Sequence, residues 1–405
     1  WTNGACESHA HAGVQTKDGG YLLVGDGECY NSRNDFERQI TVAKVDGTGN
    51  QEWMQNVGTV GYNYGKNGIE LTDGTFLVAG SLSVGSKDQY SEQRVLLRFS
   101  KEGELLKTQT FESVDTRRLD GFMGLALSAT GEILATGYVG SNLDYIDAPM
   151  FLVGGGFAVL MKLQVPASTA DDFAVVFEKV FNGTDATTKF VPYQGMRLTA
   201  DAGGYTVVAA SYVSSDEDKN TNWGLIRTDT EGTITNTTYL PPADGYQSHP
   251  YALTAGSDDG YVIAGHTLRN IDNTPQGRIV KVSPAFEVEF DYSFRQERDG
   301  YSTECYGVSI ARDGGYAVAC GTGPEEDQSS EPWQNLVQRV DSSGNSLWKN
   351  IYTGDNGKNG TGEYIVTDEV MGGYAVYMDT MCWGDGDTGG NFAIMHLDDD
   401  VPTNH

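Results

Sequence analysis

One short pattern recurs along the chain and limits what it can fold into. Each copy has a polar stretch, a tight turn rich in Asp and Gly, and a short apolar segment; the first copy reads KDGGYLLVG from Lys17. The residues that begin the apolar segments are Tyr21, Phe76, Ile133, Tyr205, Tyr261, Tyr316 and Tyr374. They lie 55, 57, 72, 56, 55 and 58 residues apart, and an insertion around Ser141 to Gly156 accounts for the long interval. Seven copies at a nearly constant period indicate seven similar structural units.

A second pattern follows each copy and marks the same units independently. It is an apolar segment with a basic residue near its end, and these residues are Lys44, Arg98, Lys162, Arg227, Lys281, Arg339 and His396. A residue type that is present in every unit favours a structural role over a role in one site. We therefore expect the basic residues to serve packing or a repeated ion pair with the turn aspartate.

The two patterns predict four strands in each unit. The Asp-Gly and Gly-Gly dipeptides supply the positive φ that tight hairpins need, so the first two strands form a hairpin. These hairpin turns are expected near residues 18, 73, 130, 202, 258, 313 and 371. A further D-x-x-G turn, as at Asp46 or Asp341, precedes the fourth strand. Short strands without helical periodicity predict an all-β fold, and repeats of this length predict a seven-bladed β-propeller with four-stranded antiparallel blades, formed by residues 1–405 as one domain.

The ends of the chain predict how such a ring closes. The last unit ends its third strand at Leu397, and the remaining DDDVPTNH is too polar for a fourth strand. Trp1 precedes Tyr21 by 20 residues, close to the 23 that separate Trp53 from Phe76. We therefore expect Trp1-Thr-Asn to supply the missing outer strand of the last blade, which removes an exposed sheet edge.

Charge excludes one large class of partner. The chain has 56 acidic and 27 basic residues and a formal net charge of −29. Such a surface repels nucleic acid and anionic membranes, so binding to nucleic acid is not expected. Solubility explains the acidic excess, because scattered charges of this kind usually form a solvated face. No apolar stretch is long enough for a transmembrane helix.

Several features predict an extracellular, secreted or cell-surface protein. The chain starts at Trp1, as expected if a leader segment has been removed. Five cysteines are compatible with an oxidising compartment. Three N-x-S/T sequons predict N-glycosylation at Asn182, Asn236 and Asn359.

The cysteine positions predict two cross-strand disulfides. Cys6 and Cys29 are placed symmetrically about the first hairpin turn, and Cys305 and Cys320 about the sixth, so each pair is expected to face across its hairpin. Cys382 lies in the last unit where Cys29 lies in the first. Pairing of Cys382 with Cys6 or Cys29 remains an alternative, because sequence does not prove connectivity.

Propellers bind ligands at the mouth of the central channel, and the repeats predict which residues line it. They are those just before each first strand or just after each second strand: His9, His11, Tyr62, Tyr64, Asp120, Tyr193, His249, Tyr251, His266, Glu304, Tyr306, Glu363, Tyr364 and Asp379. Four of the six histidines fall in this set. The tyrosines fit either platforms for sugar stacking or core aromatics, and each histidine fits either a ligand contact or a satisfied polar group at a strand end.

Two kinds of carbohydrate enzyme are compatible with this set. A polysaccharide lyase needs a Tyr or His base and a cationic group, and His249, His266 and Tyr306 with Arg269 or Arg278 fit those roles. This set resembles the His/Tyr/Arg sites of propeller lyases that act on uronates, although no contiguous motif matches. A glycosidase needs two carboxylates, for which Asp120, Glu304, Glu363 and Asp379 are candidates.

No cofactor is expected. No C-x-x-C spacing predicts a metal site. The loop from Gly384 to Gly390, with Asp385 and Asp387, is similar to a calcium-binding loop but lacks the ligand spacing of an EF-hand, so an ordinary Gly/Asp loop is favoured.

The repeated D-G-G-Y units and the D-x-x-G turns resemble the repeats of secreted bacterial-type β-propellers over nearly the whole chain. This resemblance implies a fold and no particular activity, because one fold serves many functions. We expect a non-enzymatic module that binds a glycan or protein at the channel mouth or joins an extracellular assembly. A carbohydrate-active enzyme, in particular a lyase, is the alternative, and a purely structural unit of a fibril or coat is a third.

Overall fold

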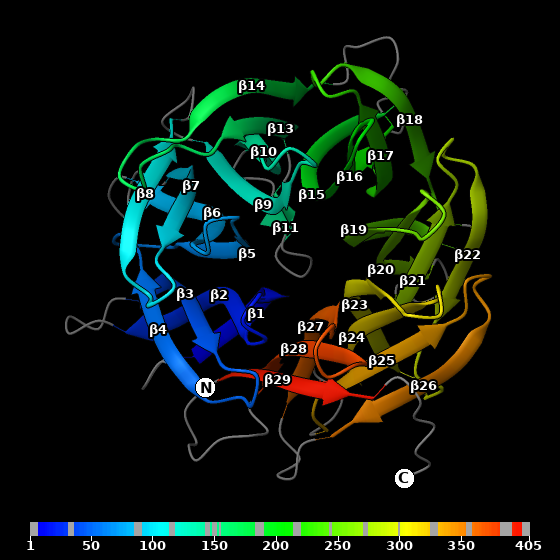
Figure 1. Ribbon diagram of the computed structural model, residues 1–405. Helices are drawn as coiled ribbons and strands as arrows, with labels where there is room; N and C mark the ends of the chain where they lie inside the picture. Colours follow the sequence, from blue (N-terminus) through cyan, green and yellow to red (C-terminus); the bar gives the residue numbers. More distant parts are fainter. Residues whose placement is uncertain are drawn as a thin grey trace. The chain divides into compact units, whose positions relative to one another are not determined.

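The computed structural model describes residues 7–30, 36–84, 91–112, 118–141, 146–147, 152–153, 155–182, 190–213, 220–242, 245–269, 274–298, 300–324, 331–353, 359–380 and 391–398. These residues form β-strands joined by turns and contain no helix, which confirms the expected all-β class (Figure 1). Their contacts divide the chain into two compact units: unit 1 is Trp1–Gln15 with Pro241–His405, and unit 2 is Thr16–Leu240.

Unit 2 consists of antiparallel strands paired in chain order. The first group is β2 (Tyr21–Tyr30), β3 (Phe36–Val45) and β4 (Gln51–Val57). The second is β5 (Tyr64–Glu70), β6 (Phe76–Val84), β7 (Ser91–Phe99) and β8 (Leu105–Phe111), and the third is β9 (Leu119–Leu127), β10 (Ile133–Ser141), β13 (Phe157–Gln164) and β14 (Ala174–Phe181). A single parallel pair, Glu92 with Leu119, joins these two groups into one eight-stranded sheet. The last group is β15 (Val191–Asp201), β16 (Gly204–Tyr212), β17 (Asn222–Thr228) and β18 (Ile234–Leu240), and β11 (Ile146–Asp147) pairs separately with β12 (Leu152–Val153).

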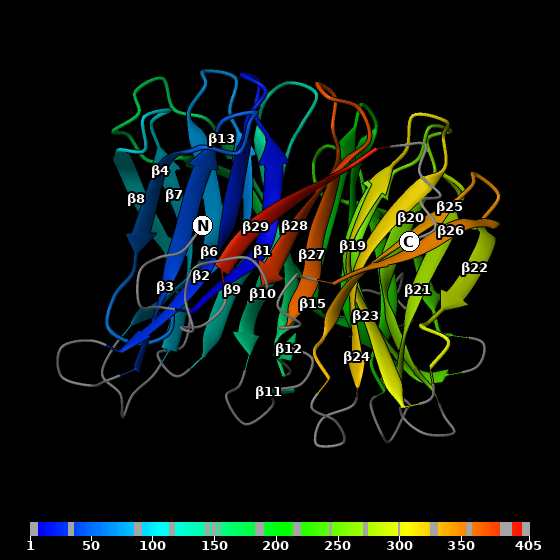
Figure 2. The ribbon, with the colours of Figure 1, turned by 90° about the horizontal axis from the view of Figure 1, so that it is seen from below.

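Unit 1 has the same kind of sheet. One contains β19 (Gly245–Ala255), β20 (Tyr261–Arg269), β21 (Pro275–Val282) and β22 (Val288–Phe294); the next contains β23 (Tyr301–Ile310), β24 (Tyr316–Pro324), β25 (Gln334–Val340) and β26 (Ser346–Tyr352). A three-stranded sheet follows, with β27 (Gly360–Thr367), β28 (Tyr374–Thr380) and β29 (Asn391–Leu397). β1 (Glu7–Gln15) contacts all three strands of that sheet. Figure 2 shows the strands of unit 1 from a second side.

Within each unit, the first strand of one sheet packs against the face of the sheet before it. In unit 1, β23 contacts β19, β20 and β21, and β27 contacts β23, β24 and β25. In unit 2, β9 contacts β5, β6 and β7 in the same way. The inner strands are therefore buried on both sides, which explains why segments such as FLVAG are continuously apolar. Four-stranded antiparallel sheets stacked in this order are consistent with propeller blades, so the fold is propeller-like.

Six of the repeated basic residues form an ion pair at the hairpin turn, which is one of the two roles expected from the sequence. Lys44 Nζ lies 3.0 Å from Asp18 Oδ2, and Lys281 Nζ lies 2.5 Å from Asp258 Oδ2. Each pair connects a strand to the turn of the neighbouring hairpin. The further pairs are Arg98 with Asp73, Lys162 with Glu132, Arg227 with Asp201, and Arg339 with Asp313. The bond from Lys281 lowers the pKa of Asp258. These cations brace the hairpin turns.

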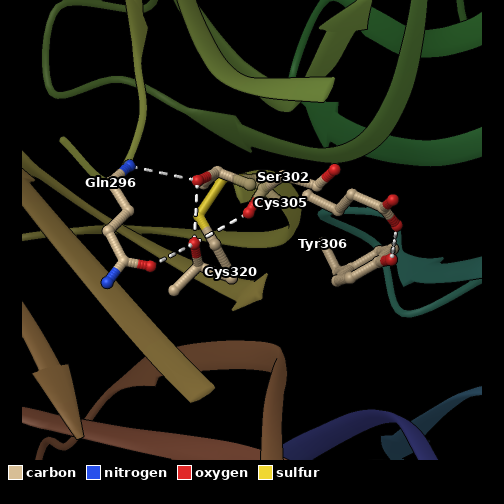
Figure 3. The surroundings of a disulfide bond; sticks show 8 residues. Gln296, Ser302, Cys305, Tyr306 and Cys320 are labelled. Atoms are coloured by element: carbon tan, nitrogen blue, oxygen red, sulfur yellow. Dashed lines mark hydrogen bonds between the residues drawn. A yellow bond between two sulfur atoms is a disulfide. The ribbon is translucent and has the colours of Figure 1, made fainter. Parts of the chain in front are cut away.

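One predicted disulfide is confirmed. Cys305 and Cys320 are direct cross-strand partners on β23 and β24, both fully buried, and their sulfur atoms are bonded. Figure 3 shows this bond beside Tyr306. Cys6, the side chain of Cys29 and Cys382 lie outside the described residues, as do Trp1-Thr-Asn and the loop with Asp385 and Asp387.

Candidate functional site

A β-bulge recurs near the middle of the first strand in six groups of strands. On β19, Pro250 and Ala252 face consecutive residues of β20, which leaves Tyr251 as the extra residue. The extra residues, found from the same register shift, are Lys66, Met123, Met196, Tyr251, Tyr306 and Glu363. A bulge bends the strand and re-aims a side chain, and such bulges often lie beside functional sites.

At three of these bulges a glycine lies opposite on the second strand, namely Gly80, Gly137 and Gly265. A Cβ on Gly265 would overlap the carbonyl oxygen of His249, and one on Gly137 would overlap that of Gly121. The side-chain-free position lets the first strand approach closely just before its extra residue. This glycine ends the apolar segments that read FLVAG, ILATG and YVIAG, whereas Ala209, Cys320 and Met378 hold the same position at the other three bulges.

In unit 1 the bulges bring predicted site residues together. Tyr251 contacts Tyr306 edge to face, with ring centroids 5.1 Å apart. The hydroxyl of Tyr306 donates a hydrogen bond of 2.5 Å to Glu304 Oε2. Tyr306, Glu304 and Glu363 are half-buried, whereas Tyr251 is buried. We call Glu304, Tyr306 and Glu363 with the underlying Tyr251 the tyrosine–carboxylate cluster.

The carboxylates suppress ionisation of the tyrosine in this cluster. Burial raises the pKa of Tyr306 well above its usual value, and the charges of Glu304 and Glu363 raise it further. Tyr306 is therefore a neutral hydrogen-bonding group near neutral pH and a poor base. Glu304 accepts the hydroxyl hydrogen of Tyr306 in a hydrogen bond, so the tyrosine acts as the donor in this pair.

The two central histidines lie behind this cluster. His249 on β19 and His266 on β20 are direct cross-strand partners with ring centroids 5.4 Å apart, and both are fully buried. The His266 ring stacks on Tyr251 at 5.1 Å. Burial lowers the pKa of His249 to about 3, and burial together with His249 lowers the pKa of His266 well below its usual value. Both rings are neutral near neutral pH and pack as core aromatics.

The cationic partner expected for a lyase is also engaged elsewhere. The guanidinium of Arg278 is buried and bonds both carboxylate oxygens of Asp291, at 2.9 and 2.7 Å. It also donates to Ser248 Oγ at 3.0 Å. The side chain of Arg269 lies outside the described residues.

A second polar pair lies on the neighbouring strands of unit 1. His9 Nδ1 on β1 lies 2.5 Å from Asp379 Oδ2 on β28, and both side chains are partly exposed, at 27% and 23%. His11 and Tyr364 are half-buried, and the ring of Tyr364 meets Tyr377 edge to face. This contact orients the imidazole of His9 toward Asp379.

In unit 2 the predicted residues have different surroundings. Tyr193 is buried and shares a hydrogen bond of 2.8 Å with Thr221, so it is a core aromatic. Asp120 is buried and accepts the backbone N–H of Gly140 at 2.7 Å. Tyr62 is 41% exposed and Tyr64 is half-buried.

The sequence reasoning missed the charged residues around Tyr64. Arg38 and Lys66 lie against its ring, and Asp26 and Glu92 are buried beside them. Asp26 occupies the position of β2 that His266 occupies on β20, five residues after the tyrosine of the repeat. An alignment of the repeats therefore places Asp26 at the same position as the predicted site residue His266.

The remaining predicted positions are mostly at the surface. Asn182 and Asn359 are exposed and Asn236 is half-buried. Asn359 Oδ1 accepts the backbone N–H of Trp333 at 2.8 Å. Among the residues that the structure describes, no group of three His, Cys, Asp or Glu side chains is arranged to hold a metal ion. No helix among them is long and apolar enough to cross a membrane.

No known family model matches the sequence, and no curated protein matches it. Solved structures that are similar to this chain include the three that follow. A protein of unknown function from Bacteroides caccae has a TM-score of 0.47 at 11% identity, over 82% of this chain and 93% of that one. A protein of unknown function from Dyadobacter fermentans has a TM-score of 0.47 at 11% identity, over 97% of this chain and 95% of that one.

The third is an alpha-L-arabinanase from Penicillium chrysogenum complexed with arabinobiose, with a TM-score of 0.43 at 10% identity, over 66% of this chain and 79% of that one. All three TM-scores are below 0.5, so these similarities assign no function. What identifies the chain is its own stacked antiparallel sheets, which make it a propeller-like all-β protein.

Proposed function

We propose that the chain is a secreted seven-bladed β-propeller that acts as a non-enzymatic binding module with a glycan ligand. Seven copies of the hairpin turn with its apolar segment support the blade count. In this proposal Trp1-Thr-Asn is the outer strand of the last blade, where the described residues contain three strands, β27 to β29. The sequons and the buried disulfide support an extracellular location.

The tyrosine–carboxylate cluster is the observation on which the ligand class rests. Sugars present hydroxyl donors around apolar ring faces, and binding sites meet them with aromatic side chains and a few placed polar acceptors. Tyr306 supplies a partly exposed ring, and Glu304 and Glu363 supply charged acceptors. With two carboxylates, the cluster favours a neutral glycan over an anionic one.

Binding is favoured over a lyase reaction by the burial of the expected acid–base groups. His249 and His266 are fully buried, and Arg278 is committed to Asp291. Among the members of the proposed lyase set whose side chains are described, Tyr306 alone is partly exposed, and its raised pKa makes it a poor base.

The test compares glycan-array binding of the wild type with that of Glu304→Gln and Tyr306→Ala. Glu297→Gln is the matched control, because Glu297 is 92% exposed and lies outside the cluster. We expect both cluster variants to lose at least tenfold in affinity for the glycans that the wild type binds, and Glu297→Gln to retain it. Unsaturated-product absorbance on uronate polymers is followed in parallel. Product formation that requires Tyr306, or binding unchanged in both cluster variants, contradicts the proposal.

A further inference from the structure

A second group of charged side chains lies in unit 2, outside the tyrosine–carboxylate cluster. It contains Asp26 on β2, Arg38 on β3, Tyr64 and Lys66 on β5, and Glu92 on β7. Lys66 is the extra residue of the β5 bulge, so it holds the position in its group of strands that Tyr306 holds on β23. We call this group the lysine–arginine cluster.

Backbone contacts hold the centre of this cluster in place. The N–H of Arg38 bonds Gly61 O at 3.0 Å, and Arg38 O accepts from the N–H and the side-chain amide of Asn63, at 2.9 and 2.8 Å. Asn63 is fully buried and also accepts from Thr59 Oγ1 at 3.0 Å. The segment that leads into Tyr64 is therefore tied to the strand that carries Arg38.

Two cations share one aromatic ring in this cluster. Arg38 Cζ and Lys66 Nζ each lie 4.9 Å from the centroid of the Tyr64 ring. Such contacts orient the cations but do not neutralise them. The carboxylates nearby are engaged: Asp26 Oδ2 lies 3.4 Å from Arg38 Nε, and Glu92 Oε2 accepts from the Tyr138 hydroxyl at 3.3 Å.

Lys66 has no carboxylate partner among the described residues. It is half-buried, and within the described part of the chain it forms no ion pair or hydrogen bond. Burial lowers its pKa to about 8, and the charges of Arg38 and Arg197 act in the same direction, while those of Asp26 and Glu92 oppose it. The charges of Asp26 and Glu92 offset only part of the cost of taking the Lys66 cation out of water, so an added anion gains affinity from it.

We propose that Lys66 and Arg38, held against Tyr64, bind the carboxylate of a small acidic ligand. A planar carboxylate matches the guanidinium of Arg38 while the ammonium of Lys66 contacts the same group. The neighbouring Tyr62 is 41% exposed and supplies an aromatic surface for the body of the ligand. This site differs from the tyrosine–carboxylate cluster in both place and ligand charge.

The test titrates the protein with glucuronate, acetate and glucose, followed by calorimetry at pH 7. We expect glucuronate to bind and glucose not to bind in unit 2. Lys66→Met should weaken glucuronate binding at least tenfold, and Lys66→Arg should weaken it less. The control is Lys101→Met, because Lys101 is 78% exposed and its side chain lies outside the cluster.

Two further readouts separate binding from folding. Lys66→Met should melt at or above the wild-type temperature, since it removes a half-buried unpaired charge. Wild-type affinity should fall as pH rises through about 8, because Lys66 then loses its proton. If acetate and glucuronate bind with equal affinity, the site recognises the carboxylate alone. If glucuronate binds more tightly, the site also contacts the sugar ring. Unchanged glucuronate affinity in Lys66→Met, or a loss of equal size in Lys101→Met, overturns the proposal.

Discussion

At the scale of single residues, burial decides which chemical role each predicted side chain keeps. His249 and Tyr306 lie on neighbouring strands of unit 1, yet the histidine is fully buried and the tyrosine half-buried. A buried imidazole without a charged partner is held neutral, because the low-dielectric interior disfavours its cation. The tyrosine keeps its proton for a related reason, since Glu304 and Glu363 oppose a further negative charge.

The neutral histidines predict acid sensitivity of folding. The pKa of His249 is about 3 in the folded protein, below its unfolded value, so the unfolded chain binds more protons as pH falls below about 6.5. Stability is therefore expected to decrease from pH 7 to pH 5, by about 2 kcal/mol for one such histidine. The variant His249→Phe should lack the loss of stability that His249 causes between pH 7 and pH 5, and it should keep the loss that His266 causes. Urea unfolding at pH 7 and pH 5 measures the change in the free energy of unfolding for the variant and for the wild type. An identical change in both proteins would contradict the lowered pKa of His249.

At the scale of elements, the β-bulge places a different side chain at the same position of successive groups of strands. The same register shift presents Lys66 on β5, Tyr251 on β19, Tyr306 on β23 and Glu363 on β27. The surrounding hairpin turn and its ion pair remain constant. The side chain therefore varies at one position per group of strands without disturbing the stacking that holds the strands.

The glycine opposite the bulge predicts a large loss of stability on substitution. Gly265→Ala places a Cβ into the carbonyl oxygen of His249, and backbone cannot move aside as a flexible side chain can. We expect a loss of at least 3 kcal/mol in the free energy of unfolding. Gly131→Ala is the control: Gly131 has φ +82° but open space around it, so its expected cost is about 1–2 kcal/mol. Chemical denaturation measures both, and equal losses would show that close approach at the bulge is unimportant.

At the scale of the whole molecule, the proposed ring depends on the amino terminus. The last group of strands contains three described strands, and the proposed fourth is Trp1-Thr-Asn. An open ring would expose a sheet edge and the apolar face behind it.

Deletion of residues 1–5 is therefore expected to lower the melting temperature by several degrees, because the outer strand of the last blade is lost. Removal of residues 401–405 from the other terminus is the control of equal length and should leave the melt unchanged. Differential scanning calorimetry measures both. If the amino-terminal deletion variant has the same melting temperature as the full-length chain, the proposed ring closure is refuted.

The sequence by itself predicted the strands, the hairpin turns and the Cys305–Cys320 pairing, and it offered the ion pairs of Lys44 and Lys281 as one of two roles for the repeated basic residues. These features depend on local periodicity and on spacing about one hairpin, which neighbouring residues specify. Only the tertiary structure decided that His249 is buried while Tyr306 is half-exposed, and that Arg38 meets Lys66 over Tyr64. Burial and those charge contacts arise from strands far apart in the chain packing against one another, and spacing within one repeat carries no information about them.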